Sequence, residues 1–164
     1  MEDKLWAPWR IEYIRNDAFK PDSECFFCKY QKENKDEKNL VLHRGNNSFV
    51  LMNHYPYTNG HLMVSPYQHT GKLNNLDQET RLEIINLIDA SCDIVRKKMN
   101  AGGFNVGLNL GEVAGAGFAQ HIHFHIVPRW KGDTNFMPVT GHTKVISEGM
   151  QQTYSNLKPE FEKL

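Results

Sequence analysis

The chain has 164 residues, 40% of them hydrophobic, which allows one domain with a core but not two comfortable ones. Its 19 Lys and Arg residues balance its 19 Asp and Glu residues, so charge gives no reason to expect nucleic acid as a partner. The chain shows no signal-peptide pattern, no apolar run near the roughly 20 residues of a membrane span, and only three cysteines, which together favour the cytoplasm.

The first part of the chain is expected to form an N-terminal arm. Residues 1–24 mix aromatic anchors with charges, and residues 29–39 are almost wholly polar, as in a solvated loop or a frayed helix. We therefore expect a single domain, in which an arm over residues 1–39 precedes a core over residues 40–130 and a C-terminal segment over residues 131–164.

Short apolar runs separated by turn residues predict three strands before the first long helix. Residues 40–43 and 48–52 flank a Gly-Asn-Asn turn and predict a hairpin. An Asn-Gly break precedes a third strand over residues 61–64, which Pro66 is expected to end.

The clearest predicted element is a helix over residues 77–99. Apolar residues recur there at three- and four-residue steps, which predicts one buried stripe. Asn75 or Asp77 is expected to cap the start of the helix, and Gly102 and Gly103 are expected to stop it. The predicted stripe consists of Leu82, Ile85, Ile88, Cys92, Val95 and Met99.

Two more strands, with a loop between them, follow the helix. Residues 104–110 alternate in polarity, residues 111–117 form a glycine-rich loop, and residues 121–127 alternate strictly before Pro128, which is expected to end the strand. A short C-terminal helix is expected over residues 147–163. Strands, one long helix and then strands predict an α+β domain whose antiparallel sheet has about five strands.

Three histidines at alternate positions form the most informative motif. Side chains alternate between the faces of a strand, so His121, His123 and His125 are expected to share one face, about 6.5–7 Å apart. The pattern allows three interpretations: a strand whose polar face happens to hold histidines, a His-x-His zinc site, or a nucleophilic centre. Imidazole is a good neutral nucleophile that can approach phosphate without repulsion, and the central His123 is best placed for this role.

The histidine motif and several other segments resemble one known family. The run His121-Ile-His-Phe-His-Ile-Val127 matches the signature of the histidine triad family at every position, with histidines alternating with apolar residues. The resemblance implies the α+β fold of that family. Residues 5–10 and 130–139 resemble a narrower branch, which contains diadenosine tetraphosphate phosphorylases and related hydrolases.

The resemblance also implies roles for individual residues. His123 would be the nucleophile that takes the nucleoside monophosphate, and His125 would contact phosphate and help the leaving group to depart. His121 and His61 would complete the catalytic group. The implied substrate-binding residues are Asn53 for the ribose or base, Asn109, Gly115 and Gly117 for phosphate, and Trp130 at the leaving-group pocket. For Trp130 the alternative is an ordinary wall residue, and for the glycine loop alone it is a tight turn.

Cys25 and Cys28 have the spacing of a metal knuckle. The alternative is a pair of reduced core cysteines, whereas a redox pair is disfavoured because no βαβ pattern surrounds them. Structural zinc needs four ligands, and only two are local. His69 and His121 could complete the site, and the resemblance supports these positions because several family members carry such a zinc. The metal would be structural and would tie the N-terminal arm to the histidine strand.

The function that the resemblance implies is transfer of a nucleoside monophosphate from a dinucleoside polyphosphate to water or phosphate, through a covalent intermediate on His123. One alternative is hydrolysis of adenosine phosphoramidates, which would use the same nucleophile. Another is non-catalytic nucleotide binding, against which the intact triad argues. The resemblance implies a homodimer, and neither a nucleic acid nor a membrane is expected as a partner.

Overall fold

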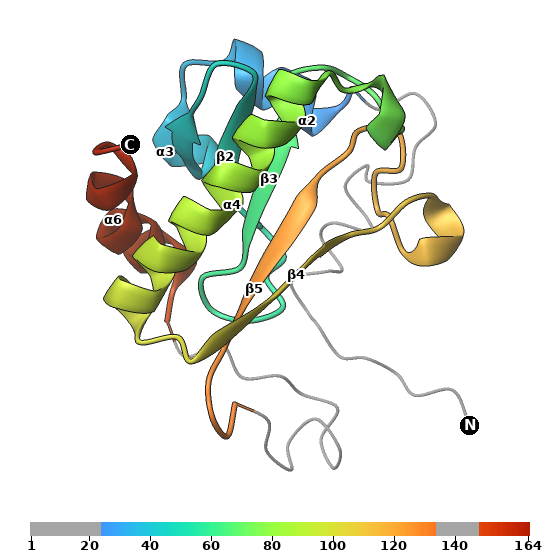
Figure 1. Cartoon of the computed structure of the whole chain (residues 1–164). Helices are drawn as coiled ribbons and strands as arrows, with labels where there is room; N and C mark the ends of the chain where they lie inside the picture. The colour runs from blue at the N-terminus through green and yellow to red at the C-terminus, as the bar shows by residue number, and fades with distance from the viewer. Residues whose placement is uncertain (1–23, 134–147) are drawn as a thin grey trace.

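The structure is a computed structural model that describes residues 24–133 and 148–164. Within these ranges the strands form one antiparallel sheet in the order β1-β2-β3-β5-β4 (Figure 1). The strands are β1 (Val41–Arg44), β2 (Ser48–Met52), β3 (Leu62–Pro66), β4 (Gly103–Leu108) and β5 (Phe124–Arg129). The α-helices are α2 (Phe26–Lys32), α3 (Asp36–Asn39), α4 (Gln78–Met99) and α6 (Met150–Phe161). The 3₁₀ turns are η1 (Leu73–Asn75) and η2 (Glu112–Ala114).

The predicted fold class is confirmed: an α+β domain with a five-stranded antiparallel sheet, one long helix and a C-terminal helix in the described ranges. Parts of two predictions lie outside these ranges, namely the arm over residues 1–23 and the branch-like residues 134–139. No helix in the described part of the chain is long and apolar enough to cross a membrane.

The long helix α4 begins as predicted but ends differently. The Asp77 carboxylate accepts a hydrogen bond of 2.7 Å from the backbone N–H of Thr80, so Asp77 is the N-cap. The helix ends at Asn100, whose φ of 52° is left-handed, a conformation that Asn tolerates at a C-terminus. The prediction that Gly102 and Gly103 stop the helix was therefore wrong, because Gly103 already begins β4.

The buried stripe of α4 is only partly the predicted one. Leu82 and Ile85 are 60% and 56% exposed, so their predicted burial was wrong. Residues two apart on a helix do not share a face, and Leu82 lies two positions from the buried Ile84. The stripe that faces the sheet consists of Thr80, Ile84, Leu87, Ile88, Ser91 and Val95, with Cys92 and Met99 packed at its side.

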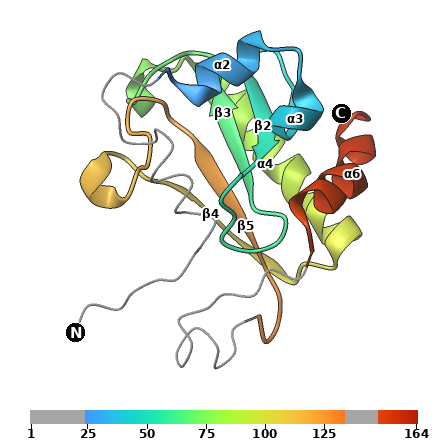
Figure 2. The same cartoon turned by 180° about the vertical axis from the view of Figure 1, so that it is seen from behind.

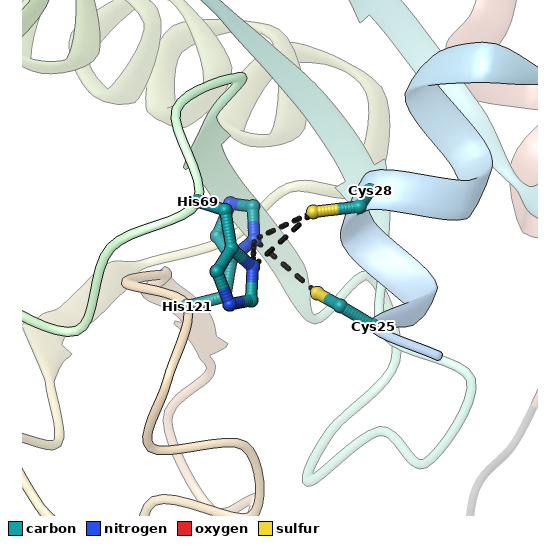
Figure 3. A group of neighbouring side chains, drawn as sticks. All are labelled: Cys25, Cys28, His69 and His121. Carbon is teal, nitrogen blue, oxygen red and sulfur yellow. Dashed lines mark hydrogen bonds between the residues drawn. The ribbon is translucent and has the colours of Figure 1, made fainter. Parts of the chain in front are cut away.

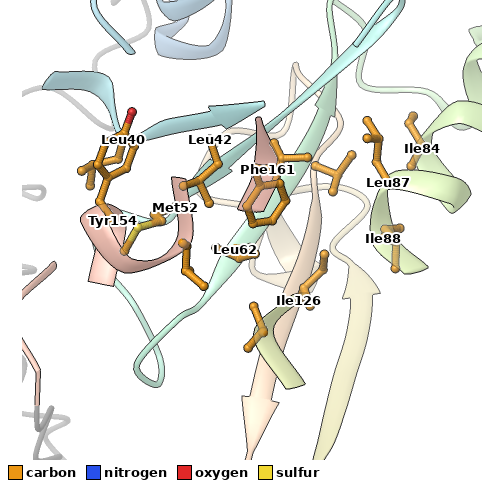
Figure 4. Packing of buried hydrophobic residues seen from close by; sticks show 14 of the residues in the cluster. Leu40, Leu42, Met52, Leu62, Ile84, Leu87, Ile88, Ile126, Tyr154 and Phe161 are labelled. Carbon is orange, nitrogen blue, oxygen red and sulfur yellow. The ribbon is translucent and has the colours of Figure 1, made fainter. Parts of the chain in front are cut away.

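Helices lie on both faces of the sheet. Helix α4 crosses one face beside α6 (Figure 1), and Figure 4 shows the core that they form with the strands. Along β2, Val50 and Met52 point into this core, whereas Phe49 and Leu51 point into a second cluster on the opposite face. Helix α2 lies over that second face (Figure 2), to which it contributes the fully buried Phe27.

Strand β5 starts and ends later than predicted. It begins at Phe124, so His121 and His123 lie in the segment that leads into it, where His121 forms a bend, and it continues through Pro128 to Arg129. Proline lacks a backbone N–H, but β3 pairs only with Phe124–Ile126 and does not reach it. On that side of β5, the carbonyl of Pro128 accepts a hydrogen bond from the Thr58 hydroxyl at 3.1 Å and none from β3.

The two edges of the sheet differ. The edge strand β1 is covered by α6, since the Tyr154 hydroxyl and the Lys158 ammonium donate hydrogen bonds to the carbonyls of Val41 and Leu42 at 3.1 and 3.0 Å. The other edge strand, β4, pairs with β5 on its inner side and carries the exposed Val106.

Candidate active site and metal centre

His123 is held in one tautomer. Its Nδ1–H donates to the backbone carbonyl of His121 at 2.9 Å, because a carbonyl can only accept. The neutral ring therefore carries a lone pair on Nε2. Burial lowers the pKa of His123, and this effect outweighs the hydrogen bond to His121, which acts in the opposite direction. The side chain thus stays neutral at physiological pH and keeps the Nε2 lone pair.

His125 is held in one tautomer by a chain of hydrogen bonds, and burial keeps it neutral. The backbone N–H of Tyr57 donates to Nδ1 of His61 at 3.0 Å, so the proton of neutral His61 lies on Nε2. That Nε2–H donates to Nδ1 of His125 at 3.0 Å, which leaves the His125 proton on its own Nε2. Burial, with a smaller contribution from His123, lowers the pKa of His125 to about 4. His125 therefore offers a hydrogen-bond donor without a positive charge.

The side chain of Asn53 supports this chain. Its Oδ1 accepts a hydrogen bond from the backbone N–H of Tyr55 at 2.9 Å, which orients the amide. The Nδ2 group then faces Nδ1 of His61 at 3.3 Å. The structure thus brings Asn53 beside His61, with both ends of the buried amide used inside the protein.

The glycine-rich loop contains several hydrogen bonds of its own. Gly111 and Gly115 have φ angles of 86° and 88°, a region that favours glycine. The N–H of Gly115 donates to the carbonyl of Glu112 at 2.8 Å, and Nδ2 of Asn109 donates to the carbonyl of Gly115 at 3.2 Å. The N–H of Gly115 is therefore used inside the loop, and contact of Gly115 with phosphate stays a prediction. Gly117 follows in the turn that leads to the triad.

Trp130 is not brought to the triad. Its ring packs against the core cluster under α4, and its Nε1–H donates to the carbonyl of Met99 at 2.9 Å. His123, by contrast, contacts Phe27, which belongs to the cluster on the opposite face. The structure gives Trp130 a role at the C-terminal end of α4, in place of the predicted position in the leaving-group pocket.

The four predicted metal ligands lie together. Cys25 and Cys28 stand at the start of α2, His69 follows β3, and His121 precedes β5; their ligand atoms all lie within 4.8 Å of one another (Figure 3). Nδ1 of His121 lies 3.3 Å from the Cys25 sulfur and 3.2 Å from Nδ1 of His69. Two sulfurs and two imidazole nitrogens that converge at such distances fit tetrahedral zinc.

The protonation of these groups also suits a cation. Nε2 of His121 donates to the carbonyl of Pro66 at 2.9 Å, so Nδ1 presents its lone pair to the other three ligands. Burial is the largest cause that raises the pKa of the Cys25 thiol, to about 12. A thiol in such surroundings becomes a thiolate when a metal ion supplies the opposite charge.

The loop that carries His69 is packed tightly against the triad segment. The N–H of Ile122 donates to the carbonyl of Thr70 at 2.7 Å, and a side chain at Gly71 would collide with the carbonyl oxygen of Ala119. Glycine at position 71 is thus required for the close approach that places His69 beside His121.

Two features of the site were not predicted from the sequence. One is the backbone N–H of Tyr57, which sets the tautomer of His61. The centroid of the Tyr57 ring lies 4.5 Å from that of the His61 ring. The other is Phe27, whose ring lies close to both His121 and His123. Its position between the two cysteines of a knuckle that includes His121 was the only signal for it in the sequence.

Comparisons with known proteins agree on one family. The HIT domain family matches residues 34–132. An AP-4-A phosphorylase of Mycobacterium tuberculosis is 36% identical over 163 residues, covering 96% of this chain and 84% of that protein. An adenosine 5'-monophosphoramidase of Schizosaccharomyces pombe is 31% identical over 105 residues, covering 64% of this chain and 74% of that protein. A zinc-bound histidine triad family protein from Mycobacterium smegmatis shares the fold, with a TM-score of 0.69 at 23% identity over 85% of this chain and 94% of that one.

Proposed function

Because this chain belongs to the histidine triad family, whose HIT domain matches residues 34–132, we propose that it is an enzyme that transfers a nucleoside monophosphate. The donor is a dinucleoside polyphosphate such as diadenosine tetraphosphate, the chemistry named in a relative that is 36% identical over almost the whole chain. The acceptor is water or inorganic phosphate, and the nucleoside monophosphate is carried between donor and acceptor by His123.

One observation carries this proposal: the buried His123 ring has a free Nε2 lone pair because its Nδ1–H is bound to the His121 carbonyl. The lone pair attacks the phosphorus of the nucleoside monophosphate unit, and an N–P bond forms while the bond to the bridging oxygen breaks. The electron pair leaves with that oxygen on the released polyphosphate. Water or phosphate then attacks the same phosphorus, and the N–P bond breaks to regenerate His123.

The state of His125 favours polyphosphate over amine leaving groups. A polyphosphate departs as a stable anion, which a hydrogen bond from neutral Nε2–H stabilises. An amine that leaves from a phosphoramidate must be protonated. A neutral imidazole would then have to transfer its proton, and donating a hydrogen bond would not suffice. Hydrolysis of phosphoramidates remains the alternative activity, because a phosphoramidase is among the relatives. His61 and Asn53 act in this proposal as supports that keep His125 in the donor tautomer.

The loop over residues 111–117 forms the phosphate end of the proposed pocket. The Asn109 side chain ties the end of β4 to the loop through its hydrogen bond to the Gly115 carbonyl. Phosphate contact is assigned to this segment, including Gly117. Trp130 takes no part in substrate binding here, because it is bound to the end of α4.

We also propose that Cys25, Cys28, His69 and His121 hold one structural zinc ion. Their convergence and donor types support this assignment. When bound, the metal supplies the charge that keeps the thiols ionised and ties α2 to the segment that carries His123. The thiols must be reduced to bind it, which supports a cytoplasmic location.

The acceptor is tested with diadenosine tetraphosphate at increasing phosphate concentration. We expect phosphate to compete with water, because any nucleophile that fits the vacated leaving-group pocket can attack the intermediate. Attack by phosphate gives ADP and ATP, whereas attack by water gives AMP and ATP, and chromatography separates these products. Adenosine phosphoramidate is run in parallel, and we expect it to be turned over more slowly than the tetraphosphate.

The outcomes of this experiment separate the candidate functions. Only AMP and ATP at every phosphate concentration would make the enzyme a hydrolase. Faster turnover of the phosphoramidate would establish the alternative activity. Binding without turnover of either substrate would leave a nucleotide-binding protein and refute the proposal.

We further propose that two copies pair through β4. An edge strand offers backbone N–H and C=O groups to another strand, and within residues 24–133 and 148–164 no strand pairs with the outer side of β4. Val106 on this strand is 47% exposed, so its apolar side chain would be buried by a second sheet edge.

The pairing is tested by Val106→Lys, which places a charge on the edge. We expect the wild type to sediment as a dimer and the variant as a monomer, measured by analytical ultracentrifugation. The matched control is Leu82→Lys, since Leu82 is a similarly exposed apolar residue on α4 and should leave the dimer intact. A monomeric wild type, or a Val106 variant that stays dimeric, would contradict this proposal.

A further inference from the structure

Phe27 links the metal knuckle to the nucleophile. It lies in α2 between Cys25 and Cys28, and its side chain is fully buried. Its ring centroid lies 4.9 Å from that of His123, at an interplanar angle of 33°. The same ring lies 5.0 Å from that of His121, at 37°. One aromatic ring thus lies against both imidazoles and is tilted relative to each.

The proposed reaction changes the charge on the ring that Phe27 contacts. When Nε2 of His123 gives its lone pair to phosphorus, Nδ1 keeps its proton, so the imidazole becomes cationic while the phosphoryl oxygens stay anionic. The group that accepts the Nδ1–H, at 2.9 Å, is the His121 carbonyl, which carries no negative charge to balance the cationic ring. The positive charge is lost again when water or phosphate attacks and the N–P bond breaks. Groups that favour a cationic ring therefore stabilise the step in which the N–P bond forms.

We propose that Phe27 is a positioning residue that acts through His123: its π face orients the ring of the nucleophile and stabilises the positive charge on that ring in the covalent intermediate. An aromatic face attracts a cation within about 6 Å of its centroid, and more strongly where water is excluded. The inference rests on the proposed function, since it concerns the intermediate on His123. In this inference the metal knuckle also positions the nucleophile, because the helix turn that carries the two cysteines places the Phe27 ring against His123.

The test replaces Phe27 with phenylalanines that carry one, two and five fluorine atoms on the ring. Fluorine withdraws electrons from the π face and changes the size of the ring little. We expect the single-turnover rate of His123 nucleotidylation to fall at each step, on the order of tenfold overall for the pentafluoro ring. The KM for diadenosine tetraphosphate, the zinc content and the melting temperature should stay close to the wild-type values. A purely structural role would change stability, with no ordered effect of fluorination on rate.

The chain offers a matched control in Phe49. It is fully buried in the same cluster, 6.4 Å from Phe27, and its ring stacks on Tyr67. The same fluorinated series at Phe49 should leave the nucleotidylation rate unchanged. Phe27→Leu, which keeps an apolar side chain without a π face, should lose at least as much rate as the pentafluoro ring while retaining zinc.

The results distinguish failure of this inference from failure of the proposed function. A flat rate across the Phe27 series in an active enzyme, or an equal decline in the Phe49 series, would overturn the role of Phe27 alone. A wild-type enzyme that forms no nucleotidyl-His123 would overturn the proposed function, and the inference with it.

Discussion

Replacing His123 with alanine is expected to reduce turnover by about 10⁴-fold or more, since loss of a covalent nucleophile costs several orders of magnitude in other enzymes. In the proposed reaction the Nε2 lone pair of His123 attacks phosphorus, and that lone pair exists because the His121 carbonyl holds Nδ1–H. His125 is not placed to substitute for it, because its Nδ1 accepts from His61 and its Nε2 carries the remaining proton. Turnover is measured with diadenosine tetraphosphate, with far-ultraviolet circular dichroism to check folding.

The control for this experiment is His43→Ala. His43 lies on β1 and donates from Nδ1 to the carbonyl of Phe161 at 3.0 Å, so its loss affects packing against α6 and not the triad. That variant should keep near wild-type turnover. The His123 variant should still bind nucleotide, because the groups assigned to phosphate and nucleoside remain. A His123 variant that keeps a tenth of wild-type kcat would show that another group is the nucleophile.

Strand periodicity predicted that His123 and His125 lie side by side, but it could not predict the protonation of the histidines. Alternation places His123 and His125 together, and their rings are 4.9 Å apart. Their tautomers depend on a carbonyl and a backbone N–H, from His121 and Tyr57. Such groups leave no residue-specific signal in a sequence, because every non-proline residue carries them.

The same periodicity, applied further, would have corrected the interpretation of Trp130. Counting in steps of two from Ile126 through Pro128 reaches Trp130, so it belongs on the α4 face with Ile126 and not on the face of His125. The prediction instead relied on its place in a segment that resembles the phosphorylase branch. A resemblance gives the order of residues along a chain, whereas the face on which a side chain lies follows from the geometry of the strand.

The helix and the metal site both show that local spacing in the sequence does not predict which residues meet in the folded chain. The spacing of apolar residues predicted the length of α4. It also placed Leu82 in the buried stripe, because apolar character alone does not show whether a residue lies on the buried or the exposed face of a helix. The Cys25 and Cys28 pair was recognisable locally, whereas His69 and His121 lie far along the chain and were supplied by family resemblance. Only the folded chain, with Thr70 bonded to Ile122, explains why they meet.

Loss of the zinc site is expected to destabilise the protein as a whole. Cys25→Ser and Cys28→Ser should each reduce zinc from about one ion per chain to a small fraction, as measured by metal analysis on protein prepared without chelators. We expect a fall in melting temperature of roughly 10 °C, which corresponds to a loss of about 3 kcal/mol for a chain of this size. The matched control is Cys92→Ser, since Cys92 is a half-buried thiol on α4 away from the cluster, and zinc content should not change.

The same variants should also slow nucleotidylation, although neither cysteine touches the substrate in the proposed reaction. His121 is the shared element: its Nδ1 faces the metal cluster while its carbonyl holds the proton of His123. Phe27, between the two cysteines, lies against both histidine rings. Release of the knuckle therefore loosens two contacts of the nucleophile at once. Wild-type protein that contains no zinc would refute the metal site but leave the role of His123 standing, whereas zinc-free Cys variants with unchanged nucleotidylation rates would show that the knuckle stabilises the fold without positioning His123.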